Sequence, residues 1–178
     1  ADHCAPSRYA GYFDPLALAF VSQGYVVVSP DYAGLGTEGV QGYGDAVDTA
    51  HSLLDAPAAV RGVLAPEALS DRNVVVGYSQ GAGAALNVHG LAGSYGMAGH
   101  LSAVVAFAGT VVTSPTVDPD PFQWAGYIQA NYGYGASAGF GSLMLYSHGA
   151  NNVVPPTPGV FFHEDYRDQI LEWIETLC

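Results

Sequence analysis

The feature that most constrains this chain is the pentapeptide G-Y-S-Q-G at residues 77–81, which has the G-x-S-x-G form. In this form a serine sits on a sharp turn between a strand and a helix, with its hydroxyl exposed. A β-branched run at residues 73–76 precedes the pentapeptide, and small residues follow it, so a helix can pack closely on the strand. The motif therefore predicts a nucleophile, Ser79, and an oxyanion donor, the backbone N–H of Gln80.

The rest of the chain predicts strands that alternate with helices. Three apolar runs indicate strands, at residues 25–29, 73–76 and 101–108, and the first should be buried on both faces. Helices are expected at residues 16–23, 45–64 and 80 to about 91, with a final amphipathic helix from about Glu164. Pro57 should kink the second of these helices or divide it in two. The alternation predicts an α/β fold with a doubly wound, mostly parallel sheet.

Charge and hydropathy exclude several classes of partner. The chain has 16 acidic residues, four arginines and no lysine, for a formal net charge of −12. Such a surface repels nucleic acid and anionic lipid. The longest apolar runs are far shorter than the roughly 20 residues of a membrane-spanning helix. Because these runs are short, we expect no integral membrane segment. The six histidines show no ligand-like spacing beside a carboxylate cluster, so we expect no metal, and we expect no cofactor.

Three segments carry a family resemblance when taken in order. They are C-A-P-S at residues 4–7, S-Q-G-Y-V-V-V-S-P-D-Y-A-G-L-G at residues 22–36 and G-Y-S-Q-G at residues 77–81. Together they resemble the secretory lipase, or lipase A-like, family of α/β-hydrolases. The resemblance implies a partial α/β-hydrolase core at residues 1–112 and the start of a cap, or lid, at residues 113–178. It also implies a secreted serine esterase or lipase that acts on ester or lipid substrates through an acyl-enzyme on Ser79.

Cys4 and Cys178 are the two cysteines and lie near the two ends of the chain. An even count in a lysine-free, acidic sequence favours a disulfide and an extracellular or periplasmic setting over two unrelated buried thiols. The resemblance implies a similar link, because the family joins a cysteine near the oxyanion loop to one in the cap. A Cys4–Cys178 disulfide in a secreted protein is therefore the expectation.

The catalytic acid and histidine have two possible locations. In α/β-hydrolases they follow the serine, and the resemblance places both beyond Cys178, on a segment or second chain outside this sequence. The second oxyanion donor would precede Cys4. A rival interpretation keeps the triad inside, because residues 143–155 are similar to a hydrolase strand and acid loop, and His163 precedes the last helix. The acid position then holds Asn151, with Asp118 or Asp120 as another option, although these two lie between prolines and more often make turns.

Two other functions stay open. G-Y-S-Q-G-A at residues 77–82 is equally similar to the elbow of cutinases, although their cysteine-flanked aspartate is absent here. A chain without its own acid and histidine could instead be a non-catalytic hydrolase-like fragment or a binding module. Asp31, at the end of a predicted strand, is interpreted as a loop anchor rather than a catalytic acid.

Overall fold

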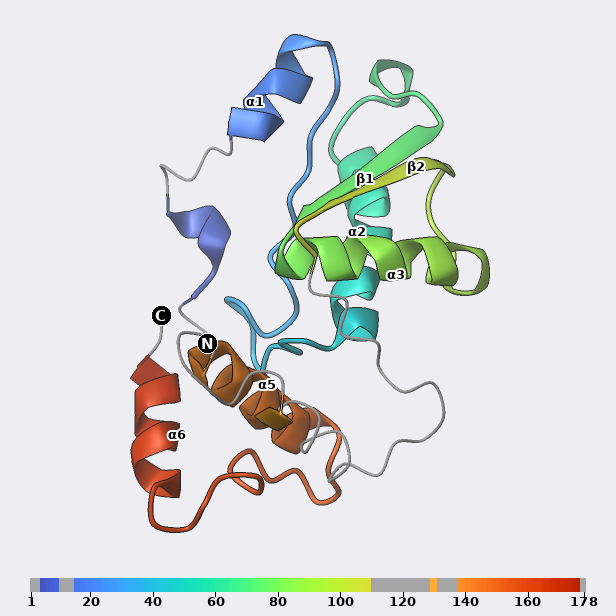
Figure 1. The fold of residues 1–178 in the computed structure, drawn as a ribbon. Helices are drawn as coiled ribbons and strands as arrows, with labels where there is room; N and C mark the ends of the chain where they lie inside the picture. Colours follow the sequence, from blue (N-terminus) through green and yellow to red (C-terminus); the bar gives the residue numbers. More distant parts are fainter. Residues whose placement is uncertain (1–3, 10–14, 110–128, 131–137, 177–178) are drawn as a thin grey trace.

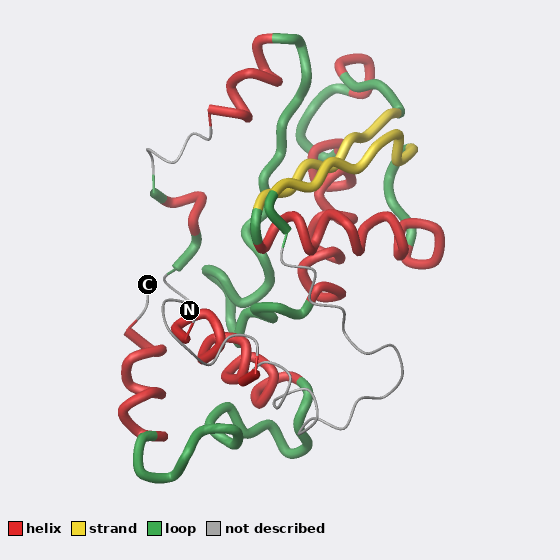
Figure 2. Tube along the Cα trace, in the orientation of Figure 1, coloured by secondary structure: helices red, strands yellow, loops and turns green. Residues whose placement is uncertain are grey.

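The computed structural model describes residues 4–9, 15–109, 129–130 and 138–176 (Figure 1). Its elements are, in chain order, η1 (Pro6–Arg8), α1 (Pro15–Ser22), α2 (Ala46–Arg61), η2 (Pro66–Ala68), β1 (Arg72–Tyr78), α3 (Gln80–Tyr95), β2 (His100–Phe107), α5 (Ala138–Asn151) and α6 (Arg167–Thr176). Figure 2 shows that the strands of the described part lie together beside α2 and α3, whereas α5 and α6 form a helical region below them. None of the helices in these ranges is long and apolar enough to cross a membrane.

The strands β1 and β2 pair in parallel, from Arg72 opposite His100 to Tyr78 opposite Phe107. Parallel neighbours need a crossover connection, and α3 supplies it by running along one face of the pair (Figure 1). The predicted α/β class with a parallel sheet is therefore confirmed. β1 and α3 begin and end within a few residues of their predicted limits, apart from the end of α3, which lies at Tyr95 rather than near residue 91.

The core lies between this sheet face and the two helices α2 and α3. Its central cluster consists of Ala50, Leu54, Val75, Ala85 and Val88. Ala50 and Leu54 are four residues apart on α2, and Ala85 and Val88 are three apart on α3, so each pair presents one helical face. Alanine at both helix surfaces allows α2 and α3 to approach closely.

The segment at residues 25–29 is not a strand, and that prediction was wrong. Residues 25–32 have no regular secondary structure, and Val26, Val27 and Val28 are 40–49% exposed. A strand exists only by pairing with a neighbour, and in the described part of the chain β1 and β2 pair only with each other. The run therefore has the apolar, β-branched composition of a strand, but no strand in the described part of the chain pairs with it.

The turn before that segment begins at Gly24, directly after the helix expected at residues 16–23. Gly24 has φ +85° and donates its N–H to the Val21 carbonyl, while Tyr25 donates to the Phe20 carbonyl. These are the two bonds of a Schellman motif, in which glycine adopts the left-handed conformation. The rings of Phe20 and Tyr25 also meet edge to face at 5.7 Å, which is the apolar contact that accompanies this motif.

Two further expectations need correction. Of the two effects expected of Pro57, a kink or a division, the division is wrong, because α2 is one helix from Ala46 to Arg61 with Pro57 inside it. Proline removes one backbone bond, and the buried face of α2 together with its N-cap, Asp45, holds the remaining turns in place. The proposed strand within residues 143–155 is also wrong, because α5 occupies Ala138–Asn151. A short apolar run has no period that separates a buried helix from a strand.

The final amphipathic helix is confirmed as α6, although it begins at Arg167 rather than near Glu164. Ile174 is 7% exposed and Trp173, one position earlier, is 45% exposed, as expected when only one helical face is covered.

Candidate active site

Ser79 lies at the turn between β1 and α3, in a strained backbone conformation. Its dihedral angles are φ 52° and ψ −115°. Among the described residues other than glycine, only Ala108 shares a positive φ. Such a conformation costs of order 1–3 kcal/mol and persists only where the surroundings impose it. Here the Ser79 N–H donates to the Phe107 carbonyl of β2 at 3.0 Å, and its carbonyl accepts from the Ala82 N–H at 3.0 Å.

The glycine before Ser79, Gly77, is required by close backbone approach. A β-carbon on Gly77 would overlap the carbonyl group of Gly81, so any other residue would push α3 away from β1. The segment after β2 also lies near α3, because a β-carbon on Gly109 would lie 3.0 Å from the Ala82 side chain. The structure therefore gives a steric reason for the first glycine of the G-x-S-x-G pattern.

The Ser79 side chain faces solvent, and the first turn of α3 offers hydrogen-bond donors beside it. The N–H groups of Ala82 and Gly83 bond to the Ser79 carbonyl, at 3.0 and 3.4 Å. Within the described ranges the N–H groups of Gln80 and Gly81 make no hydrogen bond. Two free donors at the positive end of a helix can stabilise an anion next to the serine.

The loop of residues 30–36 packs beside this turn. A β-carbon on Gly81 would lie 3.6 Å from the Tyr32 hydroxyl oxygen. Burial raises the pKa of Tyr32 above its usual value of 10.0. Asp31 accepts hydrogen bonds from both the backbone N–H, at 3.0 Å, and the hydroxyl of Ser7. Asp31 is thus an anchor for the loop, as expected, and Tyr32 is a neighbour of the elbow that the sequence analysis missed.

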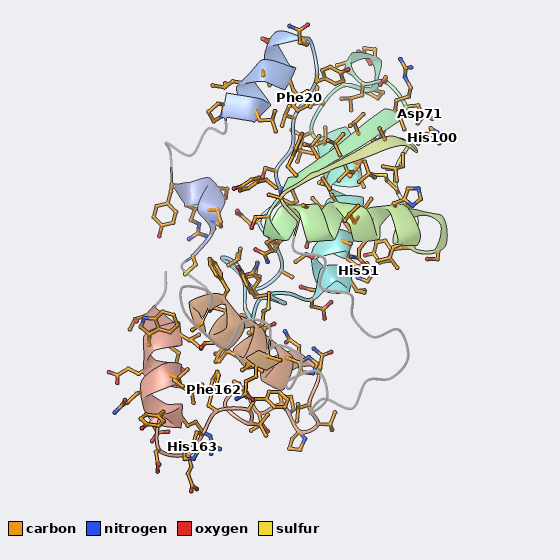
Figure 3. The ribbon with its side chains drawn as sticks, in the orientation of Figure 1. Phe20, His51, Asp71, His100, Phe162 and His163 are labelled. Carbon is orange, nitrogen blue, oxygen red and sulfur yellow. The ribbon has the colours of Figure 1, made fainter. Side chains whose placement is uncertain are left out.

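The structure does not bring His163 or Asn151 into contact with Ser79. His163 is exposed in the loop before α6, with its Nδ1 3.6 Å from the Asp165 carboxylate. Figure 3 shows it far from the sheet, on the other side of α5. The Asn151 side chain donates to the Val40 carbonyl at 3.3 Å. Asp118 and Asp120 lie outside the described residues. Among the described residues, no histidine or carboxylate makes a hydrogen bond to Ser79.

An acidic hollow lies between the loop after residue 32, the start of α2 and the end of α5. Its volume is about 330 Å³, and Glu38, Asp45, Asp48 and Asn151 are part of its lining. Burial, and secondly the charge of Asp45, raise the pKa of Asp48. In the described part of the chain, no group of three or more histidine, cysteine or acidic side chains could hold a metal ion.

His148 of α5 is a buried titratable group that the sequence analysis did not single out. Its ring stacks on Phe161 at 5.6 Å, and burial lowers its pKa while Asp45 opposes that shift. No sequence signal marked it, because a histidine within an apolar run has the same pattern whether it is exposed or buried.

The order of elements is the one found around the nucleophile of α/β-hydrolases: a strand, a strained serine, a helix and a second parallel strand. The family model described as "Alpha/beta hydrolase family" matches residues 3–177, so the chain belongs to this family. Neither the curated proteins nor the solved structures contain a match to the chain.

Proposed function

We propose that the protein is a secreted serine esterase or lipase, of the lipase A-like group, which hydrolyses carboxylic esters through an acyl-enzyme on Ser79. The observation that carries the proposal is the backbone of Ser79. Glycine would adopt φ 52° at little cost, whereas serine is strained there. A purely structural turn has no use for that strain, but a nucleophile does, because the turn presents its hydroxyl beside free N–H donors.

The reaction proceeds by two acyl transfers. Ser79 Oγ attacks the ester carbonyl carbon while an imidazole takes the hydroxyl proton, and the Gln80 N–H stabilises the oxyanion. The intermediate collapses, and the alcohol leaves with the proton from the imidazolium. Water then attacks the acyl carbon, gives its proton to the imidazole and releases the carboxylic acid and Ser79.

The imidazole and its acid belong, in this proposal, to a segment or second chain outside the sequence. A buried donor next to the nucleophile supports this. The side-chain Nε2 of Gln80 is buried and has no partner among the described residues. An unsatisfied buried donor costs about 1–3 kcal/mol, and a polypeptide that completes the site would supply the missing acceptor.

The proposal divides the chain into a doubly wound core at residues 1–112 and the start of a cap at residues 113–178. The described part of the second range contains the helices α5 and α6 and no strand, which fits a helical cap. Cys4 is disulfide-bonded, and Cys178 lies outside the described residues. A bond between them would join the core to the cap and would suit an oxidising, extracellular setting.

Labelling of the natural protein with a fluorophosphonate, followed by mass spectrometry, tests the role of Ser79. The peptide that contains Ser79 should carry the phosphonyl group, and the Ser79→Ala variant should not be labelled. Ser94→Ala, on the exposed end of α3, is the matched control and should be labelled as the wild type is. A folded wild-type protein that stays unlabelled would rule out the esterase proposal.

A second candidate function is a non-catalytic hydrolase-like module that binds a ligand or a partner. It is favoured by one observation: no described histidine or carboxylate contacts Ser79. The intact mass of the natural protein, and of any chain that copurifies with it, separates the two candidates. A copurifying chain that restores ester hydrolysis supports the esterase, whereas a folded, inactive single chain supports the binding module.

A further inference from the structure

The Tyr32 hydroxyl lies beside Gly81, in the first turn of α3 and two residues after the proposed nucleophile. It is 3.6 Å from the position that a β-carbon on Gly81 would occupy. Because Cα–Cβ bonds in a helix tilt toward the N-terminus, this position is on the N-terminal side of Gly81. Ser79 and the free N–H groups of Gln80 and Gly81 are at the same end of the helix.

The hydroxyl is available as a hydrogen-bond donor. The Tyr32 side chain is partly buried, and the structure gives its hydroxyl no hydrogen bond within the described ranges. Burial raises the pKa of Tyr32, so the phenol remains protonated and able to donate throughout the neutral and mildly alkaline range.

The backbone that carries Tyr32 is fixed from several directions. The Tyr32 carbonyl accepts from the Leu35 N–H at 2.9 Å, and the Gly34 N–H donates to Thr37 Oγ1 at 3.0 Å. Asp31 ties the same loop to Ser7. A β-carbon on Gly34, which has φ +80°, would overlap the backbone at Gln41, so the loop packs tightly there as well. A donor on such a loop is positioned before substrate binds, which is the condition for effective oxyanion stabilisation.

We propose that the Tyr32 hydroxyl donates a hydrogen bond to the oxyanion that forms when Ser79 attacks an ester carbonyl, together with the Gln80 N–H. The inference rests on the proposed esterase function and deepens it. Tyr32 transfers no proton in this role, because it stabilises the charge on the carbonyl oxygen and releases it when the intermediate collapses. It would be a donor in addition to the one that the lipase resemblance places before Cys4.

The test compares Tyr32→Phe with the matched variant Tyr25→Phe, in which a tyrosine 56% exposed in the same segment loses its hydroxyl. Steady-state hydrolysis of p-nitrophenyl acetate gives kcat and KM, and an alkyl boronic acid, which forms a tetrahedral adduct with a nucleophilic serine, probes the oxyanion site directly. We expect Tyr32→Phe to lower kcat by about 10²-fold with little change in KM. It should weaken boronate binding as well, whereas Tyr25→Phe should match the wild type.

The other outcomes separate a failure of the Tyr32 proposal from a failure of the esterase function. If the wild type hydrolyses the ester and binds the boronate, and Tyr32→Phe does both equally well, the Tyr32 proposal is wrong and the esterase function stands. If the natural protein, together with any chain that copurifies with it, does neither, the esterase function fails and the Tyr32 proposal fails with it. The thermal unfolding of both variants should also be measured. If Tyr32→Phe lowers kcat only in proportion to a loss of folded protein, Tyr32 has a structural role and the proposal is wrong.

Discussion

Ser79 occupies backbone angles that a glycine adopts at little cost and a serine does not. Replacing Ser79 with glycine should therefore relieve the strain and raise the free energy of unfolding by about 1–2 kcal/mol. The same change removes the proposed nucleophile and should abolish fluorophosphonate labelling. Urea unfolding followed by circular dichroism measures the first effect.

The matched control for this prediction is Ser79→Ala, which removes the hydroxyl but keeps a β-carbon at the same positive φ. Its stability should stay close to that of the wild type. If Ser79→Gly is no more stable than Ser79→Ala, the backbone at this position holds no strain of the expected size.

Gly77 is the second residue on which the elbow depends. A β-carbon there would overlap the Gly81 carbonyl, which is backbone and cannot rotate away. Gly77→Ala should lower the free energy of unfolding by about 3 kcal/mol, at the upper end of the usual cost of overpacking.

Gly90, farther along α3, provides the contrast because a β-carbon there would meet no atom within 4 Å. Gly90→Ala should raise the stability by up to about 1 kcal/mol through helix propensity alone. Urea unfolding of both variants measures the pair, and equal effects of the two substitutions would contradict the steric account.

At the scale of elements, α2 keeps a proline inside a continuous helix. Pro57 has no N–H to donate to the carbonyl four residues earlier, so Pro57→Ala should restore one backbone hydrogen bond and raise the stability by about 1–3 kcal/mol. Thermal unfolding measures the change. Ala58→Gly, on the exposed side of the same turn, should lower the stability by about 1 kcal/mol and so calibrates helix propensity at this place.

A destabilised Pro57→Ala variant would mean that the proline ring makes a packing contact that outweighs the missing bond. The continuous helix would then depend on that ring rather than tolerate it.

The elements that the sequence predicted well are those whose cause is local. The close approach of α3 to β1 follows from the absence of a β-carbon on Gly77, and the end of α1 follows from the positive φ of Gly24, so a few neighbouring residues account for each. The run at residues 25–29 was misread because a strand is defined by its neighbour. The helix α5 was misread in one interpretation because an apolar run of a few residues fits either state.

The same distinction applies to the candidate site. Ser79 and its N–H donors could be located from sequence, since they depend on the motif. Tyr32 could not, because its place beside Gly81 arises from the packing of two segments about fifty residues apart in the sequence.

At the scale of the whole molecule, His148 is a residue of the C-terminal helices whose pKa depends on a charge in the first part of the chain. It lies buried on α5, within the electrostatic influence of Asp45 at the start of α2. Burial lowers its pKa in the folded state, so below about pH 6.5 the unfolded chain binds a proton that the folded chain resists. The stability should therefore decrease as the pH falls from 6.5, by at most about 1.4 kcal/mol per pH unit for one proton.

Urea unfolding between pH 5 and 8 (about the range in which imidazole titrates) measures this dependence. His148→Gln should reduce the slope, and His89→Gln, at an exposed position of α3, should leave it unchanged. An identical slope in the wild type and in His148→Gln would show that other groups cause the pH dependence.

The hydrogen bond from the Ser79 N–H to the Phe107 carbonyl has a kinetic consequence. Phe107 is the last residue of β2, so the bond can form only after the chain has folded β1, crossed over through α3 and paired the second strand. Contacts between residues distant in sequence form late, because loop closure precedes them. Serine reactivity should therefore appear late during refolding, after helical structure, and the rate at which a fluorophosphonate captures Ser79 would report the moment at which the two strands join.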